Sequence, residues 1–76
     1  MEKSLSELKL GEKAIIKLIA ETPFKAKLIE MGCFVGEELY ISQIAPLGCP
    51  LAIYISGYEL SLRRNEAKDI LVDTLN

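Results

Sequence analysis

The second half of the chain alternates between apolar and polar residues, which predicts β-strands with one buried face. The run 51–56 places its two isoleucines on one face and Tyr54 on the other, and the run 58–63 alternates in the same way. Ser56-Gly57, between the two runs, is typical of a tight hairpin turn. The residues expected to point into the core are Leu51, Ile53, Ile55, Tyr58, Leu60 and Leu62.

Three further apolar runs predict strands elsewhere in the chain. Residues 13–20 are rich in β-branched side chains, which favour a strand, and residues 70–72 form a short final strand. In residues 39–45 the apolar pattern changes phase after Ile41. We therefore expect a β-bulge near residues 42–43, which would restore the pattern and help a short sheet to bend.

One segment has the spacing of an α-helix. Thr22 can cap a helix start, and Pro23 suits the first helical position because no N–H is needed there. Gly32 is expected to end the helix in the left-handed conformation. Three apolar residues between these limits share one face: Phe24, Leu28 and Met31.

Two shorter helical turns are expected near the ends of the chain. Ser4 and Glu7 have the spacing of a capping box. Ser4 would be the N-cap, and the Glu7 side chain would accept a hydrogen bond from the Ser4 backbone N–H. Asn65 is expected to cap a second turn through residues 66–68. The leucines of the first turn, Leu5 and Leu8, are expected to plug an end of the domain.

These elements predict a mainly β fold: five short strands, one short helix and helical turns, arranged as a closed or nearly closed barrel. Closure would remove exposed strand edges. The chain has 76 residues, of which 50% are hydrophobic. That length fits one small domain spanning residues 1–76, without space for a deep enclosed ligand pocket.

Composition argues against several classes of function. Nine basic residues against eleven acidic ones give a net charge of −2, which disfavours sequence-independent nucleic-acid binding. The chain has no histidine and no glycine-rich phosphate loop followed by Lys-Ser/Thr, so we expect no enzyme, no catalytic residue and no cofactor. The uncharged stretch 39–58 is interrupted by Pro46 and Pro50, so we expect no membrane insertion.

Three groups of residues could carry other chemistry. Cys33 and Cys49 are expected to be small buried apolar residues rather than a metal site or a disulfide, because their spacing lacks the short pattern of zinc sites. A basic patch of Lys27, Arg63, Arg64 and Lys68 competes with an ordinary solvated surface. An exposed apolar patch competes equally with core packing for Ile29, Phe34 and Val35.

The ordered motifs of the chain resemble those of the FeoA family, small cytosolic accessory proteins of bacterial ferrous iron uptake. The similarity spans Leu5 to Leu75, and its motifs are Lys27-Leu28-Ile29-Glu30-Met31-Gly32, Gly36, Ala45-Pro46-Leu47-Gly48-Cys49-Pro50, Gly57 and Leu60-Ser61-Leu62-Arg63-Arg64. The resemblance implies an SH3-like barrel and a partner, the ferrous iron transporter FeoB with its cytosolic GTP-binding domain. Two positions depart from the family pattern: Cys49 replaces an acidic residue, and Val35 stands where proline is common.

The leading functional hypothesis is a non-catalytic interaction module that docks on the cytosolic side of FeoB and supports or regulates Fe(II) uptake. It would be cytoplasmic, and peripheral to the inner membrane only through FeoB, with a weak homo-oligomer left open. The alternative is a metal-responsive regulatory domain, although no metal ligand is assigned. A DNA-linked regulator is disfavoured by the charge. The expected partner contacts, only some of them exposed, are Lys27, Leu28, Met31, Phe34, Arg63 and Arg64.

Overall fold

The computed structural model describes residues 2–75 and contains six strands, two α-helices and one 3-10 helix. The helical segments are the 3-10 helix η1 (Leu5–Glu7), α1 (Lys25–Glu30) and α2 (Arg64–Ala67). The strands are β1 (Glu2–Ser4), β2 (Lys13–Ile19), β3 (Glu38–Ile44), β4 (Leu51–Ile55), β5 (Tyr58–Leu62) and β6 (Ile70–Thr74). The mainly β prediction is confirmed.

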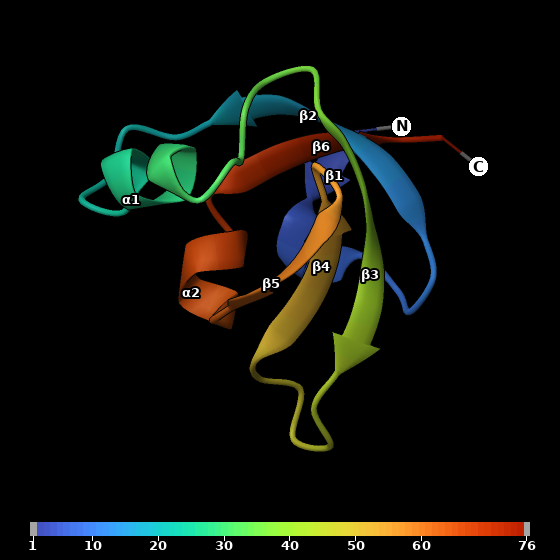
Figure 1. Ribbon diagram of the computed structural model, residues 1–76. Helices are drawn as coiled ribbons and strands as arrows, with labels where there is room; N and C mark the ends of the chain where they lie inside the picture. Colours follow the sequence, from blue (N-terminus) through green and yellow to red (C-terminus); the bar gives the residue numbers. More distant parts are fainter. Residues whose placement is uncertain (1, 76) are drawn as a thin grey trace.

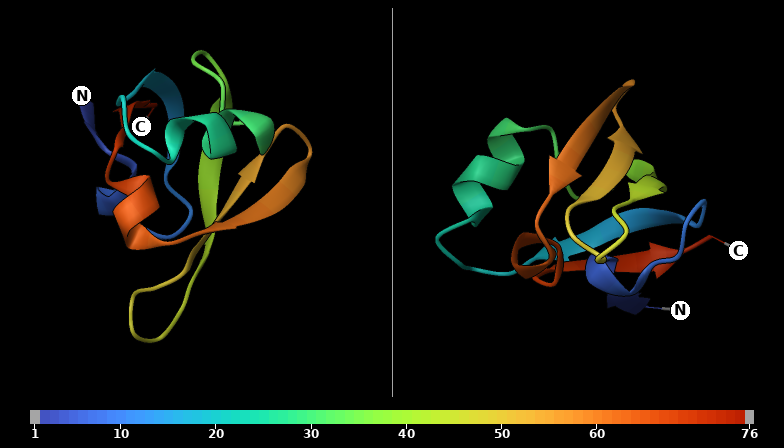
Figure 2. Two further views of the ribbon diagram at one scale, coloured as in Figure 1. Left: turned by 90° about the vertical axis from the view of Figure 1, so that its left-hand side faces the viewer. Right: turned by 90° about the horizontal axis from the view of Figure 1, so that it is seen from below.

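All six strands belong to one antiparallel sheet with the order β1-β6-β2-β3-β4-β5. The sheet curls so that β6 and β2 cross the β3–β4–β5 half, and α1 lies beside the gap between the halves (Figures 1 and 2). The register of β3 on β4 shifts between Ile41 and Gln43, which confirms the predicted bulge. A second shift lies in β2 between Ile16 and Leu18.

The core fills the inside of this curled sheet. Ile53, Ile55 and Leu62 are buried as predicted. Tyr58, by contrast, is 43% exposed, and Leu60 is only half-buried, so the prediction that both face the core was wrong for Tyr58 and incomplete for Leu60. The reason is position: β5 ends the strand order and pairs only with β4 among the described residues, so no further strand covers it.

Helix α1 is shorter at its start than the sequence suggested. Thr22 caps the turn before the helix, since its hydroxyl accepts a hydrogen bond from the Phe24 N–H at 3.2 Å. At the other end, Gly32 has φ of +101°, as predicted. The Gly32 N–H donates to the Ile29 carbonyl and the Cys33 N–H to the Leu28 carbonyl, each at 3.0 Å. This pair of bonds is a Schellman motif, which fixes where the chain leaves the helix.

The two terminal turns differ in how well the sequence predicted them. The Ser4–Glu7 capping box is present at η1, as expected. The expectation that Asn65 caps the second turn was wrong, because α2 begins at Arg64 and the Glu66 carboxylate accepts the Arg63 N–H at 3.0 Å. The predicted strand count was one too low, because the polar segment Glu2–Ser4 pairs with β6 through its backbone. Among residues 2–75, no helix is long and apolar enough to cross a membrane.

Candidate functional site

Apolar side chains are exposed where α1 ends and the chain returns to the sheet. Ile29, Phe34 and Val35 are 37%, 49% and 63% exposed, and Met31 is half-buried. We call these four residues the α1-end surface. Leu28 does not belong to it: its side chain is fully buried in the core, so its prediction as a partner contact needs correction. Leu28 instead anchors the helix from beneath.

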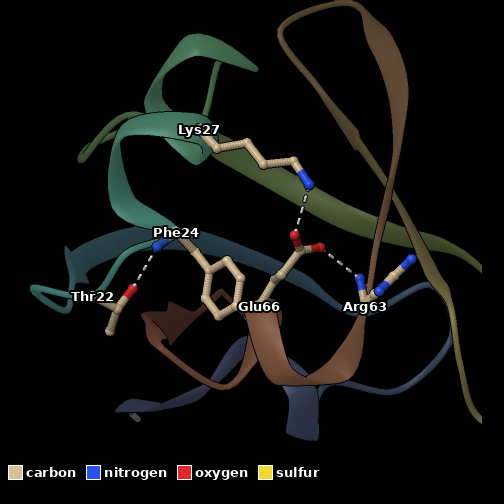
Figure 3. A network of polar contacts seen from close by, with 5 residues as sticks. All are labelled: Thr22, Phe24, Lys27, Arg63 and Glu66. Atoms are coloured by element: carbon tan, nitrogen blue, oxygen red, sulfur yellow. Dashed lines mark hydrogen bonds and ion pairs between the residues drawn. The ribbon is translucent and has the colours of Figure 1, made fainter.

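Lys27 points from α1 towards Glu66 of α2, and the two side chains join the helices (Figure 3). The Lys27 ammonium lies 2.9 Å from the Glu66 carboxylate, whose other oxygen accepts the Arg63 N–H at 3.0 Å. Glu66 is only 4% exposed. Its pKa is nevertheless lowered, first by the bond from the Arg63 backbone and then by the Lys27 ammonium, which together outweigh desolvation. The Lys27 ammonium is therefore already paired with the Glu66 carboxylate, although the Lys27 side chain is 61% exposed.

The two adjacent arginines have different surroundings. Arg63 is exposed, and its guanidinium makes no hydrogen bond within residues 2–75. The Arg64 guanidinium donates to two backbone carbonyls, those of Gly48 and Ser6. Of the predicted contact residues, Met31 and Phe34 both come at the end of α1. Lys27 and Arg63 flank Glu66, and Arg64 contacts the loop of residues 45–50 and η1.

Tyr58 fastens the end of α1 to the sheet. Its hydroxyl donates a hydrogen bond to the Met31 carbonyl, across the gap between β5 and the helix. A Cβ on Gly32 would overlap that hydroxyl, so a side chain there would displace the Tyr58 ring as well as strain a backbone with positive φ. The alternating pattern of β5 gave no sign of this contact, because it places Tyr58 on the core face.

The cysteines are separated in environment. Cys33 is fully buried, as expected, and desolvation raises the pKa of its thiol to about 11. Cys49 is exposed, so the expectation that it is buried was wrong. It lies in the loop between β3 and β4, where Leu47 is 97% exposed although the sequence pattern did not predict an exposed apolar residue there. The described residues contain no group of three His, Cys, Asp or Glu side chains that could hold a metal ion.

The described residues therefore present three surface features: an apolar α1-end surface, a charged network beside it, and an apolar loop tip. The helix α1 is fixed to the sheet by Leu28, by Tyr58 and by the Lys27–Glu66 pair. The α1-end surface is therefore held in one arrangement before any partner binds, which lowers the entropy cost of binding.

Comparison with known proteins connects this fold to ferrous iron transport. The family model described as FeoA domain matches residues 3–74. A fusion protein of Fe(2+) transport protein A and the Fe(2+) transporter FeoB from Porphyromonas gingivalis is 36% identical over 73 residues. That match covers 95% of this chain but only 9% of the fusion protein, so the chain corresponds to a small part of that relative.

Solved structures agree with the family model. The solution structure of a FeoA-like protein from Clostridium acetobutylicum is 41% identical, with a TM-score of 0.93 over 99% of this chain and 88% of that one. Stenotrophomonas maltophilia FeoA, crystallised with zinc and described as an SH3 domain protein, is 33% identical, with a TM-score of 0.75 over 92% and 88% of the two chains. The predicted SH3-like fold is confirmed.

Proposed function

The chain belongs to the FeoA domain family, and from this premise we propose that it is a non-catalytic module that binds the ferrous iron transporter FeoB and supports or regulates Fe(II) uptake. One observation carries the proposal: a relative joins a domain like this one to FeoB in a single polypeptide. Fusion holds two domains at a high effective concentration, an arrangement that suits domains whose contact matters for function.

We assign the contact with FeoB to the α1-end surface. Phe34 and Val35 supply the exposed apolar area, and aromatic anchors of this kind carry much of the energy of protein interfaces. Met31 lies beside them, half-buried, and Lys27 and Arg63 provide charge at the rim. Rim charges mainly set the association rate and its dependence on salt.

Binding would act on the transporter by shifting its conformational equilibrium. A bound protein changes such an equilibrium only by the difference between its affinities for the two states. A tenfold preference for one state corresponds to about 1.4 kcal/mol, which is within the reach of a single apolar anchor. The proposal therefore requires that the affinity for FeoB differ between nucleotide states if nucleotide controls docking.

A metal-responsive role is the alternative, supported by the zinc bound to the Stenotrophomonas maltophilia relative. In this chain the Cys33 thiol is buried with a raised pKa, which opposes the loss of a proton that metal binding needs. Calorimetric titration with Zn²⁺ and Fe²⁺ separates the two functions. Submicromolar affinity that disappears when both cysteines are replaced by serine, together with loss of FeoB binding, would favour the metal-responsive role.

The test of the proposed function is retention of this chain by full-length FeoB in nanodiscs, with and without GTP. We expect Phe34→Ser to weaken binding at least tenfold, because the loss of an apolar anchor costs about 1.4 kcal/mol or more. Leu10→Ser is the matched control, since Leu10 is 65% exposed but lies in the turn before β2. Failure of FeoB to retain the unaltered chain, or equal effects of the two substitutions, would contradict the proposal.

A further inference from the structure

Arg64 joins three segments that lie far apart in the sequence. Its Nε donates to the Gly48 carbonyl at 2.5 Å, and its Nη1 donates to the Ser6 carbonyl at 2.6 Å. Arg64 itself begins α2, so one guanidinium connects this helix with η1 and with the loop between β3 and β4. The planar fork of a guanidinium suits two acceptors at fixed angles, which a lysine ammonium does not reproduce.

The loop of residues 45–50 is shaped to meet that guanidinium. The Gly48 N–H donates to the Ala45 carbonyl at 2.7 Å, and the Ala45 N–H donates to the Pro50 carbonyl at 3.2 Å. Gly48 has φ of +86°, and a Cβ there would lie 3.3 Å from the Arg64 Nε. A side chain at residue 48 would therefore strain the backbone and push the Arg64 guanidinium away by a few tenths of an ångström.

This loop displays an apolar tip. Leu47 is 97% exposed, and Pro46, Cys49 and Pro50 beside it are exposed as well. None of these four residues has an acidic carboxyl group or a basic side chain. Single exposed leucines are common on protein surfaces, but this one stands on a turn held by internal hydrogen bonds and by Arg64. Such an anchor loses little conformational freedom when it enters a pocket.

We infer that Arg64 is a positioning residue that holds the 45–50 loop so that Leu47 enters an apolar pocket on FeoB. The inference rests on the proposed function and adds a second contact to it. The loop and α1 lie at opposite ends of the molecule (Figures 1 and 2). Substitutions at the loop therefore leave the α1-end surface intact.

We assign the tip to FeoB rather than to a second copy of this chain, because a relative carries a domain like this one fused to FeoB. If Leu47 of one copy entered a hollow at a different place on a second copy, the contact would be head-to-tail. Such contacts build open filaments unless the copies close into a ring. The hollow lined by Lys9, Leu10, Gly11 and Glu12 carries two charged side chains, the wrong chemistry for a leucine. The uncharged tip suits a pocket with apolar walls, which we place on FeoB.

The first measurement concerns the free protein and needs no partner. Arg64→Lys keeps the positive charge but removes the fork, so we expect faster amide exchange at Gly48 and a lower heteronuclear NOE at Leu47. Arg63→Lys is the matched control, because Arg63 is the exposed neighbour whose guanidinium makes no hydrogen bond within residues 2–75. Unchanged loop dynamics in Arg64→Lys would overturn the positioning role.

The second measurement is affinity for full-length FeoB in nanodiscs. We expect Leu47→Ser and Arg64→Lys each to weaken binding at least tenfold. The control is Lys13→Arg, at an exposed position of β2 outside both contact surfaces, which should leave binding within twofold. Leu47 is 97% exposed, so Leu47→Ser gives up almost no packing within the protein and should leave its stability nearly unchanged. If Arg64 were instead a charged contact, Arg64→Lys would bind nearly normally, and that result would overturn the inference.

The outcomes separate this inference from the proposed function. If the unaltered chain binds FeoB and Leu47→Ser binds equally well, the second contact is refuted while the proposed function stands. If the unaltered chain does not bind FeoB, the proposed function is refuted and FeoB is removed as the occupant. In that case the exchange and NOE measurements still decide whether Arg64 positions the loop.

Discussion

Glu66 is a nearly buried carboxylate whose two oxygens meet two donors, the Arg63 N–H and the Lys27 ammonium. Removing a carboxylate from water costs free energy unless hydrogen bonds or charges replace the lost hydration. Here the bonds more than compensate, because the pKa of Glu66 lies below its ordinary value. A carboxylate whose pKa is lower in the folded state stabilises that state at pH values above its pKa in the unfolded state. This stabilisation is lost as the pH falls through the pKa of the folded state.

We therefore expect Glu66→Gln to lower the free energy of unfolding at pH 7 by about 1–2 kcal/mol, the difference between charged and neutral hydrogen bonds. The gap to the unaltered protein should narrow below pH of about 4, as the carboxylate of the reference protein becomes protonated. Urea titrations at pH 7 and pH 3 measure both values. Glu30→Gln, at an exposed position at the end of α1, is the control. A gap that stays constant with pH would refute this account of the network.

The two thiols should differ in reactivity at pH 8. Cys33 is fully buried with a pKa of about 11, so the native protein exposes almost none of its reactive thiolate, whereas Cys49 is exposed. We expect a disulfide reagent to modify one thiol per chain rapidly and the second only on unfolding. Cys49→Ser should abolish the rapid phase, and Cys33→Ser should leave it unchanged. Two rapid phases in the native protein would contradict the burial of Cys33.

At the scale of elements, the junction between α1 and β5 depends on one glycine. Gly32 and Gly36 both have positive φ, +101° and +94°, but a Cβ meets the Tyr58 hydroxyl at Gly32 and open space at Gly36. Each change to alanine should cost about 1–2 kcal/mol for the left-handed conformation. Gly32→Ala should cost more than Gly36→Ala in denaturant titrations, and adding Tyr58→Phe should recover part of the difference. Equal costs would show that Tyr58 does not press on this position.

The elements that the sequence predicted well are those whose pattern records burial. The sequence of β4 alternates between apolar and polar residues because one face of the sheet packs against the core. The bulge in β3 follows from the change of phase in the apolar pattern after Ile41. Strand β1 could not be predicted in this way, because Glu2–Ser4 contributes backbone hydrogen bonds to β6 rather than an apolar face. The start of α2 was misplaced for a similar reason: the cap comes from Glu66, downstream, rather than from Asn65.

The candidate site was predicted only in part, because its arrangement depends on tertiary contacts. The spacing of Leu28 puts it on the same helix face as Met31, and burial alone decides that Leu28 is core and Met31 is half-exposed. Arg64 looked like half of a basic pair, but its acceptors are 16 and 58 residues away in the sequence. No local pattern reports such distances. The exposure of Leu47 had a weak local signal, an apolar residue between Pro46 and Gly48 in a turn.

At the scale of the whole molecule, the inside of the curled sheet is occupied by packed core side chains. The α1-end surface and the loop of residues 45–50 lie at opposite ends of a body measuring 28 × 24 × 22 Å. The fold therefore suits contact with large partners. We expect the purified chain to hydrolyse neither GTP nor ATP, because the sequence lacks a glycine-rich phosphate loop with its lysine. Phosphate release measured with each nucleotide tests this. Turnover that follows the protein through purification and vanishes on a point substitution would refute it.

Stability should be concentrated in the centre of the sheet. Ile53 is fully buried and pairs with Ile41 on β3 and Leu60 on β5. Ile53→Ala should lower the free energy of unfolding by about 2–5 kcal/mol, because it removes buried methyl groups and leaves a cavity. A chain of this length has a total stability of about 4–11 kcal/mol, so the loss would be a large fraction of it.

Equilibrium urea unfolding measures this loss, with Leu18→Ala as the control at a position on β2 that is 56% exposed. The control should change stability by less than about 0.5 kcal/mol, because a surface leucine gives up little contact. A loss below about 0.5 kcal/mol for Ile53→Ala as well would mean that β4 does not hold the core, since even Ile→Val at a buried position costs that much. The curled sheet would then have to be stabilised from its edges, where Leu60 is half-buried and Tyr58 is exposed.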